Sequence, residues 1–318
     1  MKNALAIFAF LRAATCRGER TALVTITRVE GSSSRAPGTH IAVSETGRWC
    51  GSLSSGCIEA AVVGEACRVI RAGITEELRF GAGSPFIDIR LPCGGAVDLL
   101  VLPQPDSHVL ELARFHLDQR HSVTLAISRA GGLCVEAGKG GPSQWRDNKF
   151  LAVHEPDLKL VIMGHGSETI ALARMARVYG ALVEVLTPDR DMLAAITETG
   201  AKAWWLKTPV RSDYLDTDAE TAVVTLFHDH DWETDLLAQA LEQDAFYIGA
   251  MGSRTTHQNR IRNLRAMGVS ESKLDRIVGP VGFIPAAREP ETLALSVLGE
   301  IVAAQRAAKQ TASARGST

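Results

Sequence analysis

The second half of the chain alternates short apolar runs with helical patterns, and this alternation constrains the fold more than any other feature of the sequence. The predicted strands cover 158–164, 181–189, 201–206, 221–227 and 244–250, and the predicted helices cover 165–180, 190–198, 232–242, 253–267 and 289–307. Strands that alternate with helices in this way form a doubly wound parallel sheet, for which we expect about six strands. The sequence therefore predicts an α/β protein with a Rossmann-like C-terminal domain.

The first half has a different pattern, in which glycine and serine interrupt short strands. The predicted strands cover 22–29, 41–43, 78–80 and 97–102, and the predicted helices cover 3–16, 57–72 and 106–119. This mixture predicts a smaller α+β domain. The glycine-rich segment Gly131–Pro142 is typical of a hairpin tip or an interdomain linker. Since 318 residues correspond to roughly two domains, we place the N-terminal domain at 1–150 and the Rossmann-like domain at 151–318.

Composition and charge exclude several classes of protein. With 46% hydrophobic residues, 22% charged residues and a formal net charge of −2, the chain has no bias toward nucleic acid or anionic lipid. No run approaches the roughly 18 apolar residues of a bilayer span. The apolar N-terminus contains Arg12, so we interpret it as an amphipathic helix in a cytoplasmic protein. The six cysteines are too dilute for a disulfide scaffold, and none of them forms a CxxC pair suited to structural zinc.

A glycine turn joins the first strand of the Rossmann-like domain to its helix. Gly164 and Gly166 permit a tight turn and close approach of the backbone to a pyrophosphate. Thr169 stands where a dinucleotide fingerprint has its third glycine, so we expect looser packing of the helix on the strand. At the end of the next strand, Asp189 is placed to bond a ribose hydroxyl and Arg190 to meet a phosphate. The alternatives are a nucleotide site or glycines that serve only the turn.

Two further strand ends face the same crevice in a doubly wound sheet. His228–Asp231 is dense in metal ligands but has no third and fourth partner, so we interpret it as a helix-capping turn with its last aspartate as the cap. In Gly249–Arg254, Gly252 and the Arg254 guanidinium precede a helix, an arrangement that can hold a phosphate. The alternative for this second segment is a tight turn in which Ser253 caps the helix.

Three segments rich in glycine and serine carry the remaining candidates, namely Gly31–Gly38, Gly51–Glu59 and Leu91–Gly95. Such segments offer backbone N–H groups to an anion, and two of them contain a thiol. Cys57 is predicted at a helix N-terminus, where the helix dipole favours a thiolate, and the glycine pair after Cys93 leaves its sulfur accessible. Each thiol is a ligand for a soft metal, a sulfur acceptor, or simply a small buried hydrophobic side chain.

Taken in order along the chain, these segments resemble the xanthine dehydrogenase accessory protein family, often called XdhC/CoxI. The runs that carry the resemblance are GSSSRAPG, GSLSSGCIEAAV, LPCGG, the GHG turn, FHDHDWETD, GAMGSR and EPETLALSVLGEIVA. The resemblance implies a small N-terminal domain joined to a Rossmann-like domain. It also implies a protein that binds molybdenum cofactor, supports its sulfuration by a cysteine desulfurase, and delivers it to an apo-molybdenum hydroxylase of the xanthine dehydrogenase type.

The resemblance also implies which residues hold the cofactor. Cys93 becomes the partner of its sulfur or molybdenum, and so the expected metal ligand. The rest of the implied pocket consists of Cys57, Arg35, Gly56, Gly94 and Gly95. The chain departs from the family pattern at Ser34, at Ser55, at His40, where the family favours a hydrophobic residue such as Met, and at the less glycine-rich 282–287.

Other functions stay open on the sequence alone. One is an NAD(P)-dependent oxidoreductase that acts on a small molecule, and another is a nucleotide-sensing regulator without chemistry. The sequence shows no set of nucleophile, base and orienting residue, which agrees with a protein that binds, protects and releases a cofactor. The apolar C-terminal helix over 289–307 packs either inside its own domain or against a second copy, and we expect a homodimer.

Overall fold

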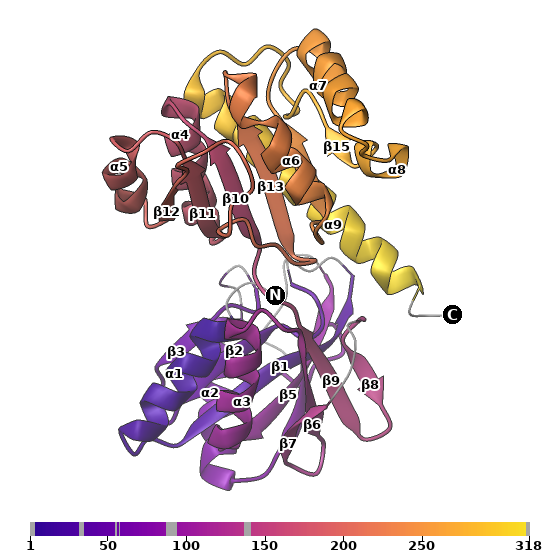
Figure 1. Ribbon diagram of the computed structural model, residues 1–318. Helices are drawn as coiled ribbons and strands as arrows, with labels where there is room; N and C mark the ends of the chain where they lie inside the picture. The colour runs from indigo at the N-terminus through magenta and orange to yellow at the C-terminus, as the bar shows by residue number, and fades with distance from the viewer. Residues whose placement is uncertain are drawn as a thin grey trace. The chain divides into compact units, whose positions relative to one another are not determined.

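The computed structural model describes residues 4–31, 35–54, 56, 58–86, 94–136 and 141–315, and it divides the chain into two compact units (Figure 1). Unit 1 is Met1–Pro156 and unit 2 is Asp157–Thr318. No helix within the described ranges is long and apolar enough to cross a membrane.

Unit 1 is built on an antiparallel five-stranded sheet with both faces covered. Its strands, in spatial order, are β3 (Trp49–Gly51), β2 (His40–Ser44), β1 (Thr21–Glu30), β5 (Ala96–Pro103) and β4 (Glu76–Gly81). Side chains alternate along β1 and β5, so one set packs on α2 (Glu59–Ala72) while the other faces α1 (Ala4–Cys16) and α3 (Ser107–Asp118). The smaller α+β domain predicted from the sequence is confirmed.

A second antiparallel sheet packs against α1 and α3. Its strands, in spatial order, are β7 (Leu133–Glu136), β6 (Val123–Ser128), β9 (Lys149–His154) and β8 (Gln144–Arg146). None of these four strands is predicted from the sequence. Two of them, β7 and β8, have only 4 and 3 residues and show little periodicity. The glycine-rich segment Gly131–Pro142 falls inside unit 1, so it is not an interdomain link. Gly131 and Gly132 lie in the turn of the hairpin formed by β6 and β7, and residues 137–140 lie outside the described residues.

Three loops leave the five-stranded sheet at the same end. In the antiparallel register Ala96 lies opposite both Glu30 and Gly81, and Gly51 lies opposite Ile41. The loops therefore adjoin one another, and we call the described residues of 31–39, 51–58 and 82–95 the loop end of unit 1. The described parts of the three segments rich in glycine and serine belong to it.

Unit 2 contains a six-stranded sheet in which every neighbouring pair is parallel. Its strands, in spatial order, are β12 (Lys202–Trp205), β11 (Leu182–Thr187), β10 (Lys159–Gly164), β13 (Thr221–Leu226), β14 (Tyr247–Ala250) and β15 (Ile277–Val278). The predicted doubly wound sheet is confirmed. The strand order reverses between β10 and β13, and ligands of such sheets bind where it reverses. We call the carboxyl ends of β10, β11, β13 and β14 the crevice end.

Helices cover both faces of this sheet, as Figure 1 shows. One face carries α4 (Ser167–Tyr179), α5 (Met192–Glu198) and α9 (Pro290–Arg315), and the other carries α6 (Thr234–Leu241), α7 (Arg254–Ala266) and α8 (Glu271–Leu274). A short 3-10 helix, η1 (His230–Trp232), precedes α6. Four side chains of α9 are buried in the core of unit 2: Ala294, Val297, Leu298 and Ile301.

Candidate functional site

The loop end of unit 1 brings together segments that are far apart in the sequence. Arg35 Nε donates a hydrogen bond to the Ser52 carbonyl at 3.3 Å, which joins the first loop to the second. Ala82 N donates to the Gly95 carbonyl at 3.1 Å, which ties the third loop to the end of β4. Arg35 is exposed, so the loop end presents a cation on its surface.

The glycines of the loop end have two different roles. Gly95 packs so tightly on β1 that an added Cβ would lie 2.3 Å from the Glu30 carbonyl oxygen. Gly94 and Gly56 have φ angles of 68° and 101°, and no described atom lies within 4 Å of the place of a Cβ. Because L side chains rarely adopt such angles, these positions need glycine. Gly95 therefore holds strands together, whereas Gly94 and Gly56 leave the backbone open to a ligand.

Glu59, which the sequence does not single out, organises the second loop from the first turn of α2. Its Oε1 accepts hydrogen bonds from Ser52 Oγ at 3.0 Å, Leu53 N at 3.2 Å and Ser54 N at 2.9 Å. Its Oε2 accepts from Ser54 Oγ at 2.5 Å and Ile58 N at 3.3 Å. Burial alone would raise the pKa of Glu59, but the hydrogen bonds outweigh it and lower the pKa. A serine-rich run before a glutamate in a first helical turn is the signal for such a carboxylate.

A pair of buried histidines lies where the first loop enters β2. His40 Nε2 is 3.1 Å from His154 Nε2 at the end of β9, and His40 Nδ1 is 2.8 Å from Thr25 Oγ1. The Phe8 ring meets the His154 ring edge-on, with 5.6 Å between centroids. Burial lowers the pKa of His40 to about 3, and burial together with His40 lowers the pKa of His154 well below its ordinary value. This partner explains how the chain accommodates His40 where the family favours an apolar residue.

Both candidate thiols, Cys93 and Cys57, lie outside the described residues, so their roles remain predictions. The described residues on either side of Cys57 are Gly56 and Ile58, and Gly94 follows Cys93. Within the described part of the chain, no group of three or more His, Cys, Asp or Glu side chains is arranged to hold a metal ion.

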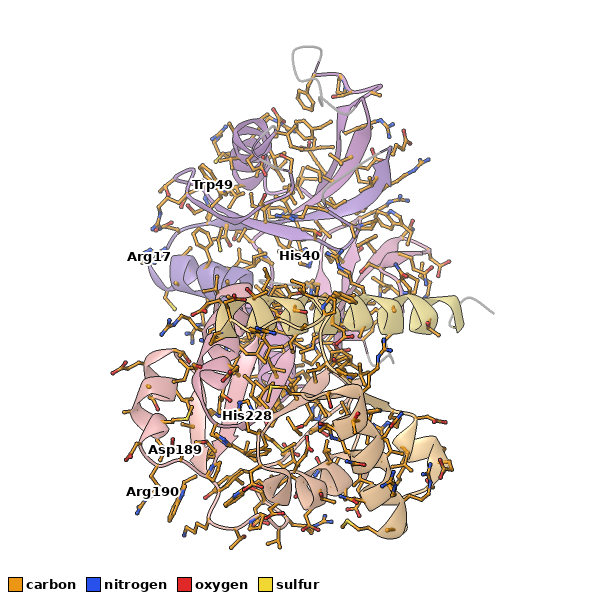
Figure 2. All side chains as sticks on the ribbon, turned by 90° about the horizontal axis from the view of Figure 1, so that it is seen from above. Arg17, His40, Trp49, Asp189, Arg190 and His228 are labelled. Carbon is orange, nitrogen blue, oxygen red and sulfur yellow. The ribbon has the colours of Figure 1, made fainter. Side chains whose placement is uncertain are left out.

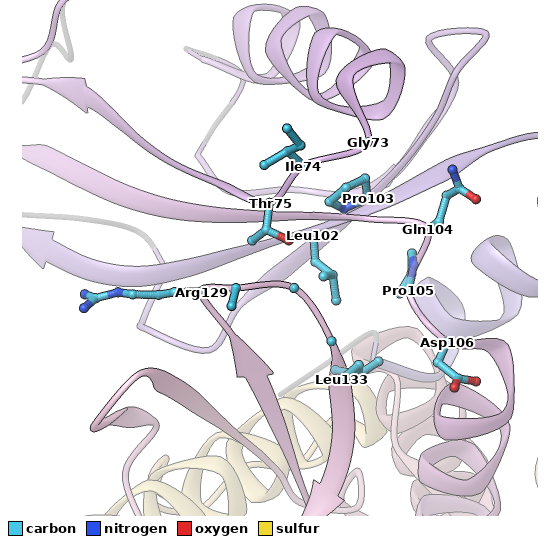
Figure 3. Close-up of a pocket in the computed structure, with 13 residues that line it drawn as sticks. Gly73, Ile74, Thr75, Leu102, Pro103, Gln104, Pro105, Asp106, Arg129 and Leu133 are labelled. Atoms are coloured by element: carbon cyan, nitrogen blue, oxygen red, sulfur yellow. The ribbon is translucent and has the colours of Figure 1, made fainter.

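A cavity of about 400 Å³ lies at the opposite end of unit 1, between α2, β5 and the turn from β6 to β7 (Figure 3). Its charged side chains already have partners within the protein. Asp106 accepts from His108 N at 2.8 Å and caps α3. Arg129 pairs with Glu77 and stacks on the Trp145 ring at 4.0 Å. We therefore do not consider this cavity a candidate site.

At the crevice end of unit 2, the turn from β10 to α4 packs tightly. An added Cβ at Gly164 would lie 2.8 Å from Thr169 Oγ1 and 2.9 Å from Leu226 Cβ. Thr169 is fully buried, and its hydroxyl donates to the His165 carbonyl at 3.1 Å. The expectation of looser packing is therefore wrong, because the buried threonine lies close to Gly164 and its hydroxyl finds a backbone acceptor.

The groups expected to bind a nucleotide near β10 and β11 contact other parts of the protein. Gly166 has a φ of 85°, and its N–H donates to Met192 Sδ at 3.1 Å. Asp189 Oδ1 accepts from Asp191 N at 2.9 Å. Arg190 is exposed beside Asp189 (Figure 2). Its guanidinium lies 4.1 Å above the Trp205 ring.

The ends of β13 and β14 form capped turns. His228 and Asp229 are exposed, and Asp229 Oδ1 accepts from Asp231 N at 3.0 Å. The predicted cap by Asp231 is wrong, because a 3-10 turn precedes α6 and the earlier aspartate closes it. Ser253 Oγ accepts from Thr256 N at 3.1 Å, so the predicted serine cap of α7 is confirmed.

The glycine and arginine predicted beside that cap lie on the surface. Gly252 has a φ of 139°, and Arg254 is the exposed first residue of α7. Beneath this turn, Arg260 and Glu233 form a buried ion pair, with 2.9 Å between the Arg260 guanidinium and Glu233 Oε1. The sequence does not reveal this pair, because neither residue belongs to a local motif.

Fold and loop geometry together define the class of protein: an antiparallel unit with a loop end rich in glycine, followed by a Rossmann domain. Residues 160–301 match the XdhC Rossmann domain, and residues 14–81 match the XdhC and CoxI family. The chain is 35% identical over 295 residues to the molybdenum cofactor insertion chaperone PaoD of Escherichia coli strain K12. The matched region covers 93% of this chain and 86% of that protein. The chain belongs to the XdhC/CoxI family.

Two more distant relatives match this chain over nearly its whole length. A probable xanthine dehydrogenase subunit from Bacillus subtilis strain 168 is 24% identical over 326 residues, with 89% of this chain and 93% of that protein covered. The crystal structure of a xanthine dehydrogenase from Bacillus halodurans superposes with a TM-score of 0.75 at 21% identity, covering 94% of this chain and 96% of that one. This structure supports the fold.

Proposed function

We propose that this protein is a chaperone for molybdenum cofactor that serves a molybdenum hydroxylase of the xanthine dehydrogenase type. The 35% identity to a molybdenum cofactor insertion chaperone, over 93% of this chain, carries the proposal. In its finer form, the protein binds the cofactor, supports its sulfuration by a cysteine desulfurase, and delivers it to the apo-hydroxylase in the cytoplasm.

We propose the loop end of unit 1 as the cofactor site. Molybdenum cofactor is an anionic pterin dithiolene that carries a phosphate, and it enters here as cargo. The exposed Arg35 guanidinium and the open backbone at Gly94 and Gly56 fit an anion. Thiolates are suitable ligands for a soft metal, which supports Cys93 as the metal ligand and Cys57 as a second thiol.

Other residues of the loop end position these groups. Glu59 fixes the second loop through hydrogen bonds to both sides of Cys57, and Gly95 keeps the third loop against β1. Binding, protection and release require no general acid or base, so the proposed chemistry of the protein is to orient the cargo and exclude water and oxygen from it. We further propose that the protein acts as a homodimer.

The alternative of an NAD(P)-dependent oxidoreductase receives no support from the crevice end. The Gly166 N–H already donates to Met192 Sδ, and the Asp189 carboxylate already caps the next turn. A dinucleotide would have to displace both contacts. We therefore prefer the chaperone.

Molybdenum and pterin content after anaerobic incubation with free cofactor tests the proposal. Wild type is expected to hold about one cofactor per chain, and Cys93→Ser is expected to lose most of it. Cys57→Ser tests the second thiol, and Cys16→Ser, which changes an exposed cysteine at the end of α1, is the matched control. If wild type and the control hold no molybdenum or pterin where a known carrier does, the proposed function is wrong.

A further inference from the structure

The crevice end of unit 2 has two unequal halves, and the half beside β11 is closed by the protein's own side chains. Met192 Sδ accepts the Gly166 N–H, the hydrogen bond that a phosphate would take at the start of α4. The Glu168 carboxylate lies next to this turn, since an added Cβ at Gly166 would be 3.0 Å from Glu168 Oε2. A phosphate here would displace a sulfur ligand and face a negative charge.

The half beside β13 and β14 is open and contains a cavity of about 290 Å³. Most of the side chains that line it are aliphatic, among them Met251, Val281, Ile284 and Leu293. The single titratable side chain in its described lining is the exposed His228. Such a surface suits an uncharged flat ring, and the volume is at the lower limit of small-molecule sites.

The outer wall of this cavity is held in place by α9. Ser296 Oγ accepts a hydrogen bond from Ile284 N at 2.7 Å. Glu300 Oε2 accepts from Gly282 N at 2.7 Å and from the Tyr247 hydroxyl of β14 at 2.6 Å. The wall is therefore anchored to both a helix and the sheet, so the cavity is a built feature of the fold.

The inner side is fixed by the buried ion pair described above. Arg260 donates to the Met251 carbonyl at 2.6 Å and to Glu233 Oε1 at 2.9 Å, and Thr225 Oγ1 donates to the same carboxylate oxygen at 2.6 Å. This network holds Met251, which lines the cavity, against the ends of β13 and β14.

One polar atom next to His228 has no partner among the described residues. His165 Nδ1 is buried without a hydrogen bond from this part of the chain, and the His165 and His228 ring centroids are 5.9 Å apart. His165 is not part of the described lining of the cavity, so His228 is the polar side chain that a ligand there would meet.

We propose that unit 2 binds the uncharged heterocyclic ring of a nucleoside in the cavity between His228, Met251 and Ile284. The half of the crevice beside β11 is closed and contributes no binding energy, so a dinucleotide binds no more tightly than its nucleoside. This inference goes beyond the cofactor role of unit 1 and does not depend on it.

Calorimetric titration of the full chain with adenosine and with NAD⁺, which contains the same uncharged adenine ring, tests the proposal. Adenosine is expected to bind saturably, and NAD⁺ is expected to bind within about threefold of adenosine. Absence of saturable adenosine binding up to about 5 mM, or NAD⁺ binding more than about tenfold tighter than adenosine, would overturn it.

Adjacent positions provide a matched pair of variants. Ile284 lines the cavity and is 44% exposed, whereas its neighbour Phe283 is 62% exposed and is not part of the described lining. Ile284→Asp places a charge in the wall and is expected to weaken nucleoside binding at least about tenfold. Phe283→Asp is expected to change it less than about twofold. Equal effects of the two variants would contradict the assignment, and circular dichroism verifies that both remain folded.

Discussion

The buried pair of His40 and His154 makes the stability of unit 1 sensitive to acid. Both imidazoles are buried, and burial holds the folded pKa of His40 at about 3 and that of His154 well below the ordinary value. In the unfolded chain each histidine has a pKa of about 6.5. As the pH falls through 6.5, the unfolded chain therefore binds protons that the folded chain does not. Stability is retained above this pH and decreases below it.

The size of the effect follows from this difference in pKa. Between pH 7.5 and 5.5, each histidine that stays neutral in the folded state reduces the free energy of unfolding by about 1.4 kcal/mol, so the pair contributes about 2.7 kcal/mol. A variant with His40→Met and His154→Leu lacks both groups. Between pH 7.5 and 5.5, its free energy of unfolding is therefore expected to fall by about 2.7 kcal/mol less than that of wild type. Other titrating groups are common to both proteins and cancel in the comparison.

Hydrogen exchange measures this effect unit by unit, which matters because a two-unit chain need not unfold in one step. The free energies of opening are compared for peptides from β1 and β2, with peptides from β10 in unit 2 as an internal control. His108→Gln, which changes an exposed histidine, is the matched control variant. For each protein, the change in the free energy of opening between pH 7.5 and 5.5 is measured. If this change differs by less than about 0.5 kcal/mol between wild type and the double variant, the histidines are not buried as a neutral pair.

Three further predictions concern residues that shape the loop end and the crevice end. Glu59→Gln puts an amide N–H₂ group against backbone and hydroxyl donors, so we expect a loss of about 1–3 kcal/mol in protection of the first turn of α2 by hydrogen exchange. An unchanged exchange rate there would show that the carboxylate does not organise the loop. Gly95→Ala forces a Cβ against the Glu30 carbonyl, and calorimetry should show unit 1 destabilised by about 1–3 kcal/mol. Arg260→Met removes the guanidinium that neutralises the buried Glu233 carboxylate, at a cost of about 3–5 kcal/mol in chemical denaturation. Adding Glu233→Leu should recover most of that loss, and a double variant as unstable as the single one would contradict the ion pair.

The parallel sheet of unit 2 is predictable because β10, β11 and β13 are buried on both faces and stand in the sequence as continuous apolar runs. The two-residue strand β15 gives no such pattern and is found only in the structure. Two strands of the second sheet of unit 1 are missed for a related reason. Its strands β7 and β8 are short and half exposed, and pairing with β6 and β9 defines them more than local sequence does.

Candidate sites show the same division between local and long-range information. The family resemblance implies a pocket shared by the glycine-rich segments, and the structure places the described parts of these segments at one end of a sheet. By contrast, His154 lies 114 residues from His40, and Arg260 lies 27 residues from Glu233. The sequence near each residue therefore does not predict its partner. The contact of Met192 Sδ with the Gly166 N–H, where a phosphate would bind, is also missed. A methionine in a helix is normally interpreted as a core residue.

Transfer of cofactor tests the central claim most directly. The chain is loaded anaerobically with sulfurated molybdenum cofactor, separated from free cofactor, and mixed with an apo-hydroxylase of the xanthine dehydrogenase type. Hydroxylase activity is expected in proportion to the loaded wild-type chain, and Cys93→Ser chain taken through the same loading is expected to support little of it. Activation by the Cys93→Ser protein equal to that by wild type would contradict Cys93 as the ligand, and failure of loaded wild type to activate the enzyme would contradict the chaperone function.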